Sequence, residues 1–293
     1  MPATSDRWAG AVALGLALTV GADLGAAVRG HRGVVDHYVA IAATPSPDPR
    51  PTPTPRVSES PGSAIGGSPA QRRTLRIAGQ GGFAFLDPPG RNGEVDRWNP
   101  CVPIHYVVDV QVGPSSAMAD IAWAFAQVSK ATGLRFVADG RTQEQPSDDR
   151  VDIRHTKAGW RWAPVLVALV PDSVYHGTGL HADKDSLAYT DPNVYSDDLG
   201  DAQIVTAQVV VDADDLTDGG HDDPGALGPT LLHEFGHLVG LDHVDEHGEI
   251  MQPDGGGVTS YGPGDLAGLR YVGKRHGCIA DSALPTDSED FPK

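Results

Sequence analysis

Three histidines and one glycine in the segment HEFGHLVGLDH constrain this chain more than any other feature. If residues 229–240 are helical, His233 and His237 stand four positions apart, so both rings lie on one face about 6 Å apart along the axis. A continuing helix would carry His243 about 9 Å further along the axis. Gly240 can take the left-handed conformation that ends a helix and lets the chain fold back. The pattern therefore predicts a helix, a sharp turn and three imidazoles in one site.

Three neutral imidazoles with an open fourth position are the ligand set of a catalytic zinc site. The predicted ligands of one Zn²⁺ are His233, His237 and His243. Glu234 projects about 100° round the helix from the first ligand, so it can hydrogen-bond a water in the open position without binding the metal. It is the predicted general base. The alternative is a buried helix whose histidines make ordinary hydrogen bonds.

The segment HEFGHLVGLDH resembles the HExxHxxGxxH signature of the metzincin zinc metalloproteases. Its residues GHLVGLDH are most similar to those of the matrixin branch, in a bacterial-type, exported form. That family has a methionine turn after the signature, and Met251 stands eight residues beyond His243. The resemblance implies that Met251 forms an apolar floor under the ligands; ordinary core filling is the alternative. It also implies an α+β fold: a twisted mixed sheet with an antiparallel edge strand, a zinc-site helix, the methionine turn and a C-terminal helix.

Two parts of the matrixin pattern differ in this chain. The segment Asn-Pro-Cys101-Val-Pro is only a partial match to a cysteine switch, so no latency mechanism is carried over. The segments His181-Ala-Asp183 and Leu187–Pro192 resemble parts of a loop that holds further zinc and calcium, but the spacing is shorter and a tyrosine replaces a histidine. A second metal site at His176 and His181 stays an open alternative to surface histidines.

The chain has a formal net charge of −17, which argues against a nucleic-acid partner. The apolar run over residues 9–28 has the length of a signal peptide or of a marginal membrane anchor, and both readings remain open beside a buried helix. Either of the first two places the protein outside the cytoplasm. Contact with a membrane is expected only through this segment, and we expect a monomer.

Four regions follow from composition. Residues 1–30 hold the signal peptide or anchor, and residues 31–73 form a proline-rich stalk that cannot pack a core. One catalytic domain is expected over residues 74–280, followed by an acidic, disordered tail over residues 281–293. Cys101 and Cys278 lie near the two ends of this domain, and in an exported protein such a pair predicts a disulfide. The alternative is a Cys101 thiolate on the zinc.

The domain shows alternating strand and helix signals. A helix is expected between Ser115 or Ser116 and Gly133, and a last helix opens after Tyr261 with an apolar face of Leu266, Leu269 and Val272. Strands rich in β-branched residues are expected at Ile104–Val110, Leu134–Val137, Val151–His155, Val165–Val170 and Ile204–Asp212.

The strand Ile204–Asp212 carries the strongest signal. By the resemblance, the strand in this place is the antiparallel edge that binds an extended peptide, and strand addition suits a protease because every peptide has the same backbone. A core strand is the alternative. The loop after it, residues 212–223, holds six aspartates, so calcium is a possible ligand beside the simpler reading of a solvated acidic loop.

Together these observations predict an extracytoplasmic zinc endopeptidase that acts on peptides or proteins. Two alternatives come from other classes of function. One is a catalytically inactive, zinc-stabilised binding module at the cell surface, and the other is a hydrolase of a non-peptide amide. Tyr261 stands ten residues past Met251, unlike the tyrosine ligand of some metzincins, and is not assigned to the site.

Overall fold

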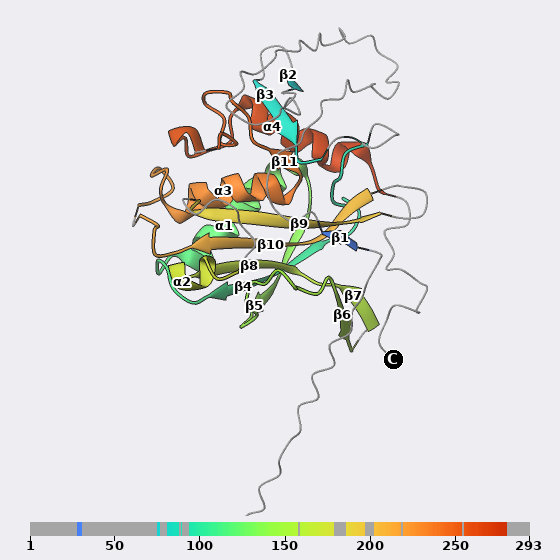
Figure 1. Ribbon diagram of the computed structural model, residues 1–293. Coiled ribbons are helices and arrows are strands. Elements are labelled where there is room, and N and C mark those ends of the chain that lie inside the picture. The colour runs from blue at the N-terminus through green and yellow to red at the C-terminus, as the bar shows by residue number, and fades with distance from the viewer. Residues whose placement is uncertain are drawn as a thin grey trace, which may run out of the picture.

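The computed structural model describes residues 28–30, 75–76, 81–87, 89, 94–157, 159–178, 186–196, 202–217, 219–253 and 255–279 (Figure 1). The predicted stalk and acidic tail, and all of the predicted signal or anchor segment except residues 28–30, lie outside these ranges. Within them, no helix combines the length and the apolar character needed to cross a bilayer.

A mixed sheet forms the centre of the domain. Its order is β1-β9-β10-β8-β4-β5, in which β5, β4, β8 and β10 run parallel while β9 lies antiparallel to β10 and β1 antiparallel to β9. These strands are β1 (Val28–Gly30), β4 (Ile104–Val110), β5 (Phe136–Arg141), β8 (Val165–Val170), β9 (Ala188–Ser196) and β10 (Ala202–Asp212). The predicted α+β class and mixed sheet are therefore confirmed.

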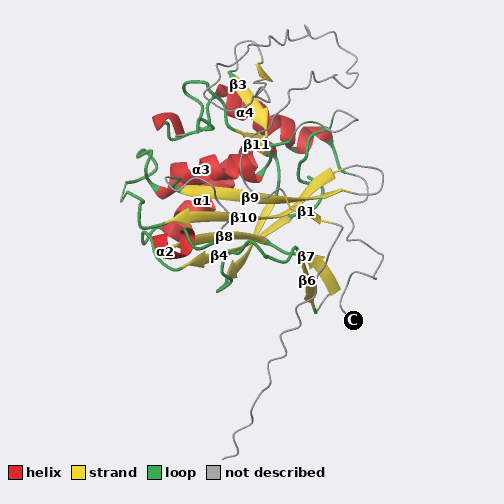
Figure 2. Ribbon diagram, in the orientation of Figure 1, coloured by secondary structure: helices red, strands yellow, loops and turns green. Residues whose placement is uncertain are grey.

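The two faces of this sheet carry different layers (Figure 2). Alternate residues of β8 and β10, such as Val167 and Val209, face a large core shared with α1 (Ala117–Thr132), α3 (Leu227–Leu238) and α4 (Pro263–Val272). Rings of Tyr106, Phe125 and Phe235 pack in series there, with centroids 4.0 and 4.2 Å apart. The intervening residues join Tyr175 of α2 (Asp172–Tyr175) in a smaller cluster on the opposite face.

Short elements complete the fold. β11 (Leu241–Asp242) pairs with β3 (Gly82–Phe85), which also pairs with β2 (Leu75–Arg76). β6 (Ile153–Thr156) and β7 (Gly159–Trp162) form a hairpin. Two 3₁₀ helices span Gly255–Gly257 and Lys274–His276. Because β11 follows α3 almost directly, its pairing with β3 connects the start of the domain to the predicted zinc segment.

Most predicted elements are present with small shifts in their ends. The strands Ile104–Val110 and Val165–Val170 have the predicted bounds, and the first helix ends at Gly133 in the left-handed conformation, with φ 75°. Ser116 occupies the N-cap without a side-chain capping bond. The strands expected at 134–137 and 151–155 begin two residues later, and the predicted zinc helix lies two residues earlier, at 227–238.

The assignment of Ile204–Asp212 to the substrate edge was wrong. β10 pairs on both sides, with β8 and β9, and its side chains are almost all buried. A continuous β-branched run is typical of an interior strand covered on both faces, which is what this segment forms. The antiparallel neighbour of β10 is β9, which pairs on its other side with β1 at Asn193–Tyr195 and whose central Asp191 and Pro192 weaken its strand signal.

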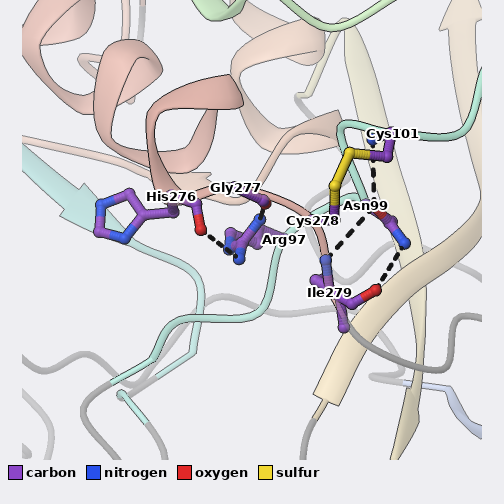
Figure 3. Close-up of a disulfide and its surroundings, with 7 residues drawn as sticks. All are labelled: Arg97, Asn99, Cys101, His276, Gly277, Cys278 and Ile279. Atoms are coloured by element: carbon purple, nitrogen blue, oxygen red, sulfur yellow. Dashed lines mark hydrogen bonds between the residues drawn. A yellow bond between two sulfur atoms is a disulfide. The ribbon is translucent and has the colours of Figure 1, made fainter.

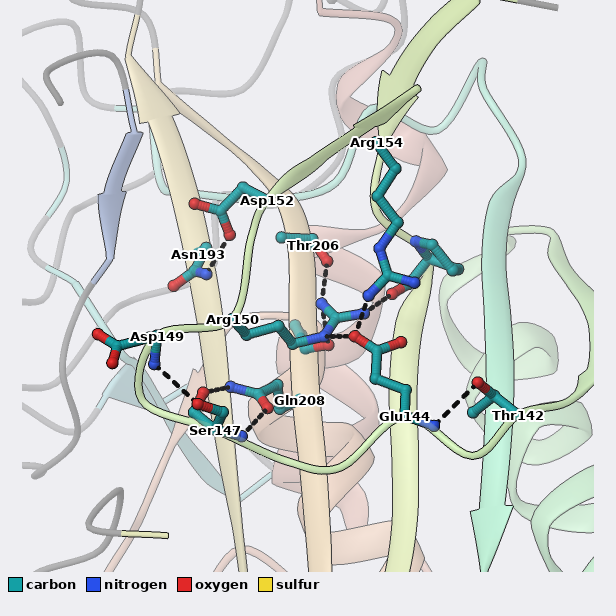
Figure 4. Close-up of polar contacts among 12 residues, drawn as sticks. Thr142, Glu144, Ser147, Asp149, Arg150, Asp152, Arg154, Asn193, Thr206 and Gln208 are labelled. Atoms are coloured by element: carbon teal, nitrogen blue, oxygen red, sulfur yellow. Dashed lines mark hydrogen bonds and ion pairs between the residues drawn. The ribbon is translucent and has the colours of Figure 1, made fainter. Parts of the chain in front are cut away.

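A polar segment between β5 and β6 crosses the face of the sheet opposite α1, α3 and α4 (Figure 4). The guanidinium of Arg150 is buried and donates to Thr206 Oγ1 at 2.9 Å, to Pro164 O at 2.5 Å and to Glu144 Oε1 at 2.9 Å. Gln208 and the main chain of Ser147 exchange two further hydrogen bonds. These contacts cover β8 and β10 with a segment that has few apolar side chains.

The structure joins Cys101 and Cys278 in the predicted disulfide, with their Cα atoms 5.4 Å apart (Figure 3). Both thiols are consumed, so Cys101 is not a thiolate ligand. Neighbouring contacts hold the same two segments together: Arg97 donates to Gly277 O at 3.1 Å, and Asn99 donates to Ile279 O at 3.0 Å. The C-terminal end of the domain is thereby attached beside the start of β4.

Removing this disulfide should destabilise the domain without changing its fold. The bond closes a loop of 177 residues, so the C101S/C278S double variant should lose about 2–5 kcal/mol through the greater entropy of its unfolded chain. Urea unfolding followed by tryptophan fluorescence measures this loss, and wild-type protein under reducing conditions is the matched control. An unchanged urea midpoint would contradict a stabilising role.

Candidate metal centre

Helix α3 and the turn after it bring the three predicted ligands together. His233 and His237 lie one turn apart on α3, which ends at Leu238. The chain then reverses at Gly240, which has φ +105°, and a Cβ there would approach Asp96 O to 2.9 Å. A side chain at this position would therefore meet both backbone strain and a steric clash. The reversal returns His243 to the two helical rings, as the spacing predicted.

The Nε2 atoms of the three rings converge on one point. They lie 3.0 Å apart for His233 and His243, 3.1 Å for His233 and His237, and 3.2 Å for His237 and His243. Three nitrogens bound tetrahedrally to zinc at about 2.0–2.1 Å would be about 3.3 Å apart. The observed spacing is thus close to that of three ligands of a single ion.

Hydrogen bonds on the other side of two rings decide their tautomers. His233 Nδ1 donates to Ile250 O at 2.6 Å, and His237 Nδ1 donates to Leu241 O at 2.7 Å. Carbonyl oxygens only accept, so the proton of each neutral ring is on Nδ1 and the lone pair is on Nε2. Burial, together with the smaller effect of the adjacent His233, lowers the pKa of His237 to about 3, so this ring is neutral.

Two neutral Nε2 atoms that both carry lone pairs cannot share a proton at 3.1 Å. A cation relieves the repulsion between them, and the carbonyl partners orient each ring for it. The group His233, His237 and His243 can therefore hold a metal ion. His237 is buried, whereas His243 is partly exposed.

The carboxyl group of Glu234 lies beside β9. Its Oε2 atom accepts a hydrogen bond from Thr190 Oγ1 at 2.6 Å, and Thr190 Oγ1 also lies 3.1 Å from the main-chain oxygen of Glu234. Glu234 is 5% exposed, and this burial raises the pKa of its carboxyl to about 7, while the Thr190 hydrogen bond acts in the opposite direction. A buried carboxyl with a pKa near neutrality can both accept and return a proton.

Met251 packs directly beneath α3. Its side chain is 1% exposed, and a Cβ added to Gly236 would lie 2.2 Å from Met251 Sδ. The glycine between the two helical ligands therefore lets the methionine approach the helix closely. This arrangement agrees with the floor implied for Met251 and makes Gly236 a second position where only a hydrogen atom fits.

Two buried carboxylates, Glu249 and Asp265, hold the Met251 segment in place. Asp265 accepts from the amides of Ile250 at 2.6 Å and Gly262 at 2.8 Å. Glu249 accepts from the amides of Gly264 at 2.9 Å and Asp265 at 2.8 Å. Burial raises the pKa of the Asp265 carboxyl, against the effect of the amides that bind it. These contacts position Ile250 O, which accepts from His233.

Sequence reasoning missed both of these residues. Asp265 stands at the third position of a helix that begins with proline, a common place for an acidic residue that binds free amides, and this is the signal that could have found it. Glu249 has no comparable signal. Tyr261, which was not assigned to the site, is partly buried and donates from its hydroxyl to Leu232 O at 2.8 Å, so it supports α3.

A second group of potential ligands lies at the far ends of β8 and β10. Asp172 of α2 and His176, which follows this helix, approach Asp212, and His176 Nε2 is 3.0 Å from Asp172 Oδ1. Asp212 belongs to the acidic loop considered for calcium. In the described part of this loop, Asp223 accepts from Thr217 and from the amide of Gly225. His181 lies outside the described residues.

Compared with protein-family models and with curated proteins, the chain has no match. The geometry itself defines a three-histidine site that can hold a metal ion, built on one helix and the turn that follows it, with a buried glutamate next to the first ligand.

The site should bind one divalent ion per chain. Titration with Co²⁺ or Zn²⁺, followed by absorption or calorimetry, should give a stoichiometry of one. In H237A the affinity should fall by more than the roughly 10–100-fold that loss of an outer hydrogen-bond partner costs, because a direct ligand is removed. His247→Ala changes an exposed histidine in the next turn and is the matched control. Equal affinities of H237A and H247A would contradict the site.

Gly236→Ala should lower stability although alanine favours helices by about 1 kcal/mol. The added Cβ meets Met251 Sδ in a fully buried position, and such overpacking costs about 1–3 kcal/mol. In a M251A background the clash is absent, so the same substitution should be neutral or stabilising. Urea midpoints of the four proteins test this, and equal losses in both backgrounds would show that the methionine does not press on the helix.

Proposed function

We propose that this protein is a zinc-dependent endopeptidase of the metzincin type that acts outside the cytoplasm. The observation that carries the proposal is the convergence of three imidazole nitrogens from α3 and its turn, with Glu234 buried beside the first of them. Imidazole alone suits several transition metals, but three histidines with an open position are typical of catalytic zinc. When bound there, zinc supplies Lewis-acid polarisation of a carbonyl and activation of a water.

The chain's own residues supply the proton transfers and the orientation. Glu234 accepts a proton from the attacking water and returns it to the leaving amine, for which a pKa near neutrality is suited. Nδ1 of His233 and His237 keep Nε2 of each ring directed into the site. The buried side chain of Met251 packs closely against Gly236 of the helix.

An extended peptide is the substrate that the fold suits best. β9 lies at the side of the sheet next to α3, and its Thr190 contacts Glu234. On its outer side, β9 pairs with β1 at Asn193–Tyr195. A peptide aligned with β9 beside Thr190 would form main-chain hydrogen bonds independent of its side chains. This proposal transfers the substrate edge from β10 to β9.

Two features support a location outside the cytoplasm. The Cys101–Cys278 disulfide is typical of oxidising compartments. The apolar run at residues 9–28, read as a signal peptide or an anchor, agrees with export.

Glu234→Gln should abolish proteolysis while leaving the metal in place. The amide cannot accept the proton of water, so cleavage of a labelled, denatured protein should fall by at least the 10²–10⁴-fold typical of a lost general base. Zinc content, measured by elemental analysis, should stay at one per chain. Asp245→Asn, an exposed carboxylate two residues past His243, is the matched control. Unchanged proteolysis in E234Q would refute the role of Glu234, whereas a zinc-loaded wild type that cleaves nothing would favour a binding module.

A further inference from the structure

The hydroxyl of Thr190 donates a hydrogen bond to the Glu234 carboxyl, with Oγ1 2.6 Å from Oε2. We infer that Thr190 is a positioning residue for Glu234: it holds the carboxyl group in one orientation beside the three-histidine site. This inference rests on the proposed function, in which Glu234 is the general base. Neither the metal-ligand spacing nor the methionine turn gives any sign of this residue.

The distances indicate how the single hydroxyl proton is used. A charge-assisted O–H···O⁻ bond is about 2.5–2.7 Å long, so the 2.6 Å contact fits donation from Thr190 to an ionised Glu234. The 3.1 Å contact to the main-chain oxygen of Glu234 is longer and weaker. That oxygen lies within α3, and the single hydroxyl proton is already donated to Oε2.

The contact between Oγ1 and Oε2 suits both forms of a general base. When Glu234 is ionised, Thr190 donates to its Oε2 atom. Once Glu234 has accepted a proton on its other carboxyl oxygen, Oε1, the Oε2 atom becomes a carbonyl oxygen that still accepts from Thr190. No hydrogen bond is lost between the two forms. The orientation of the carboxyl group is therefore retained through the proton transfer.

The backbone around Thr190 is fixed by the sheet. Thr190 pairs with Val209 of β10, and its neighbours Tyr189 and Asp191 pair with Val210 and Gln208. Its β-branched side chain has few rotamers, which limits the positions of the hydroxyl. Because the same strand offers its outer edge to a peptide, the substrate backbone and the base would be aligned by one element. A carboxyl group held only by its own flexible side chain would lack this alignment.

Two substitutions at this position separate positioning from packing. Thr190→Val keeps the shape and strand preference but removes the hydroxyl, and Thr190→Ser keeps the hydroxyl. With one zinc per chain retained, T190V should lower kcat by about 10–100-fold, with KM changed by less than about twofold, since outer hydrogen-bond partners typically have effects of this size. T190S should recover most of the lost kcat. Thr206→Val, which removes a buried hydroxyl bonded to Arg150, is the matched control for destabilisation alone.

A double-mutant cycle in urea provides a readout that does not require activity. T190V, E234A and the double variant are compared with wild type, and the midpoint shift caused by T190V should be clearly smaller once the carboxyl group is absent. Normal kcat in T190V, or a T190S variant as impaired as T190V, would overturn the inference. If the wild type cleaves nothing, the proposed function has failed. The cycle then decides alone: additive midpoint shifts overturn the inference, and coupled shifts support it.

Discussion

Nδ1 of His233 and Nδ1 of His237 each donate to a main-chain carbonyl beyond the helix that carries the two rings. Because both Nδ1 protons are used in these hydrogen bonds, the Nε2 atoms carry lone pairs that point toward each other. This arrangement suits a cation. The rest of the C-terminal half can be understood from these two bonds. Leu241 O is placed by the turn at Gly240 and by the pairing of β11 with β3.

The other carbonyl, Ile250 O, depends on two buried carboxylates. Asp265 binds the amide of Ile250 itself, and Glu249 binds the first amides of α4. Burying a carboxylate is unfavourable unless hydrogen bonds replace its water, and here each accepts at least two amide donors. The first turn of α4 therefore acts as a support for the segment that carries Met251. The ligands, the methionine and the last helix form one connected unit.

β9 connects the central sheet to this unit of histidines, methionine and last helix. It packs beside α3 and brings Thr190 to Glu234, and in the proposed function its outer edge also receives the substrate. The family resemblance implied that edge for β10, which also carries the strongest strand signal in the sequence. The strong strand signal of β10 reflects the burial of both its faces and does not indicate an accessible edge. Pro192 and Asp191 make β9 a weak strand by composition, and its pairing with β10 forms it nonetheless.

Features that depend on local spacing could be predicted from the sequence. The i, i+4 pair His233 and His237, the reversal at Gly240 and the strands at β4 and β8 all follow from periodicity and glycine conformation. The tertiary structure alone decided which strand lies at the edge, and which distant groups support the site. Thr190, Glu249 and Asp265 reach their partners across 14 or more residues of sequence. Such contacts leave no periodic signal, because they arise only when separate elements pack together.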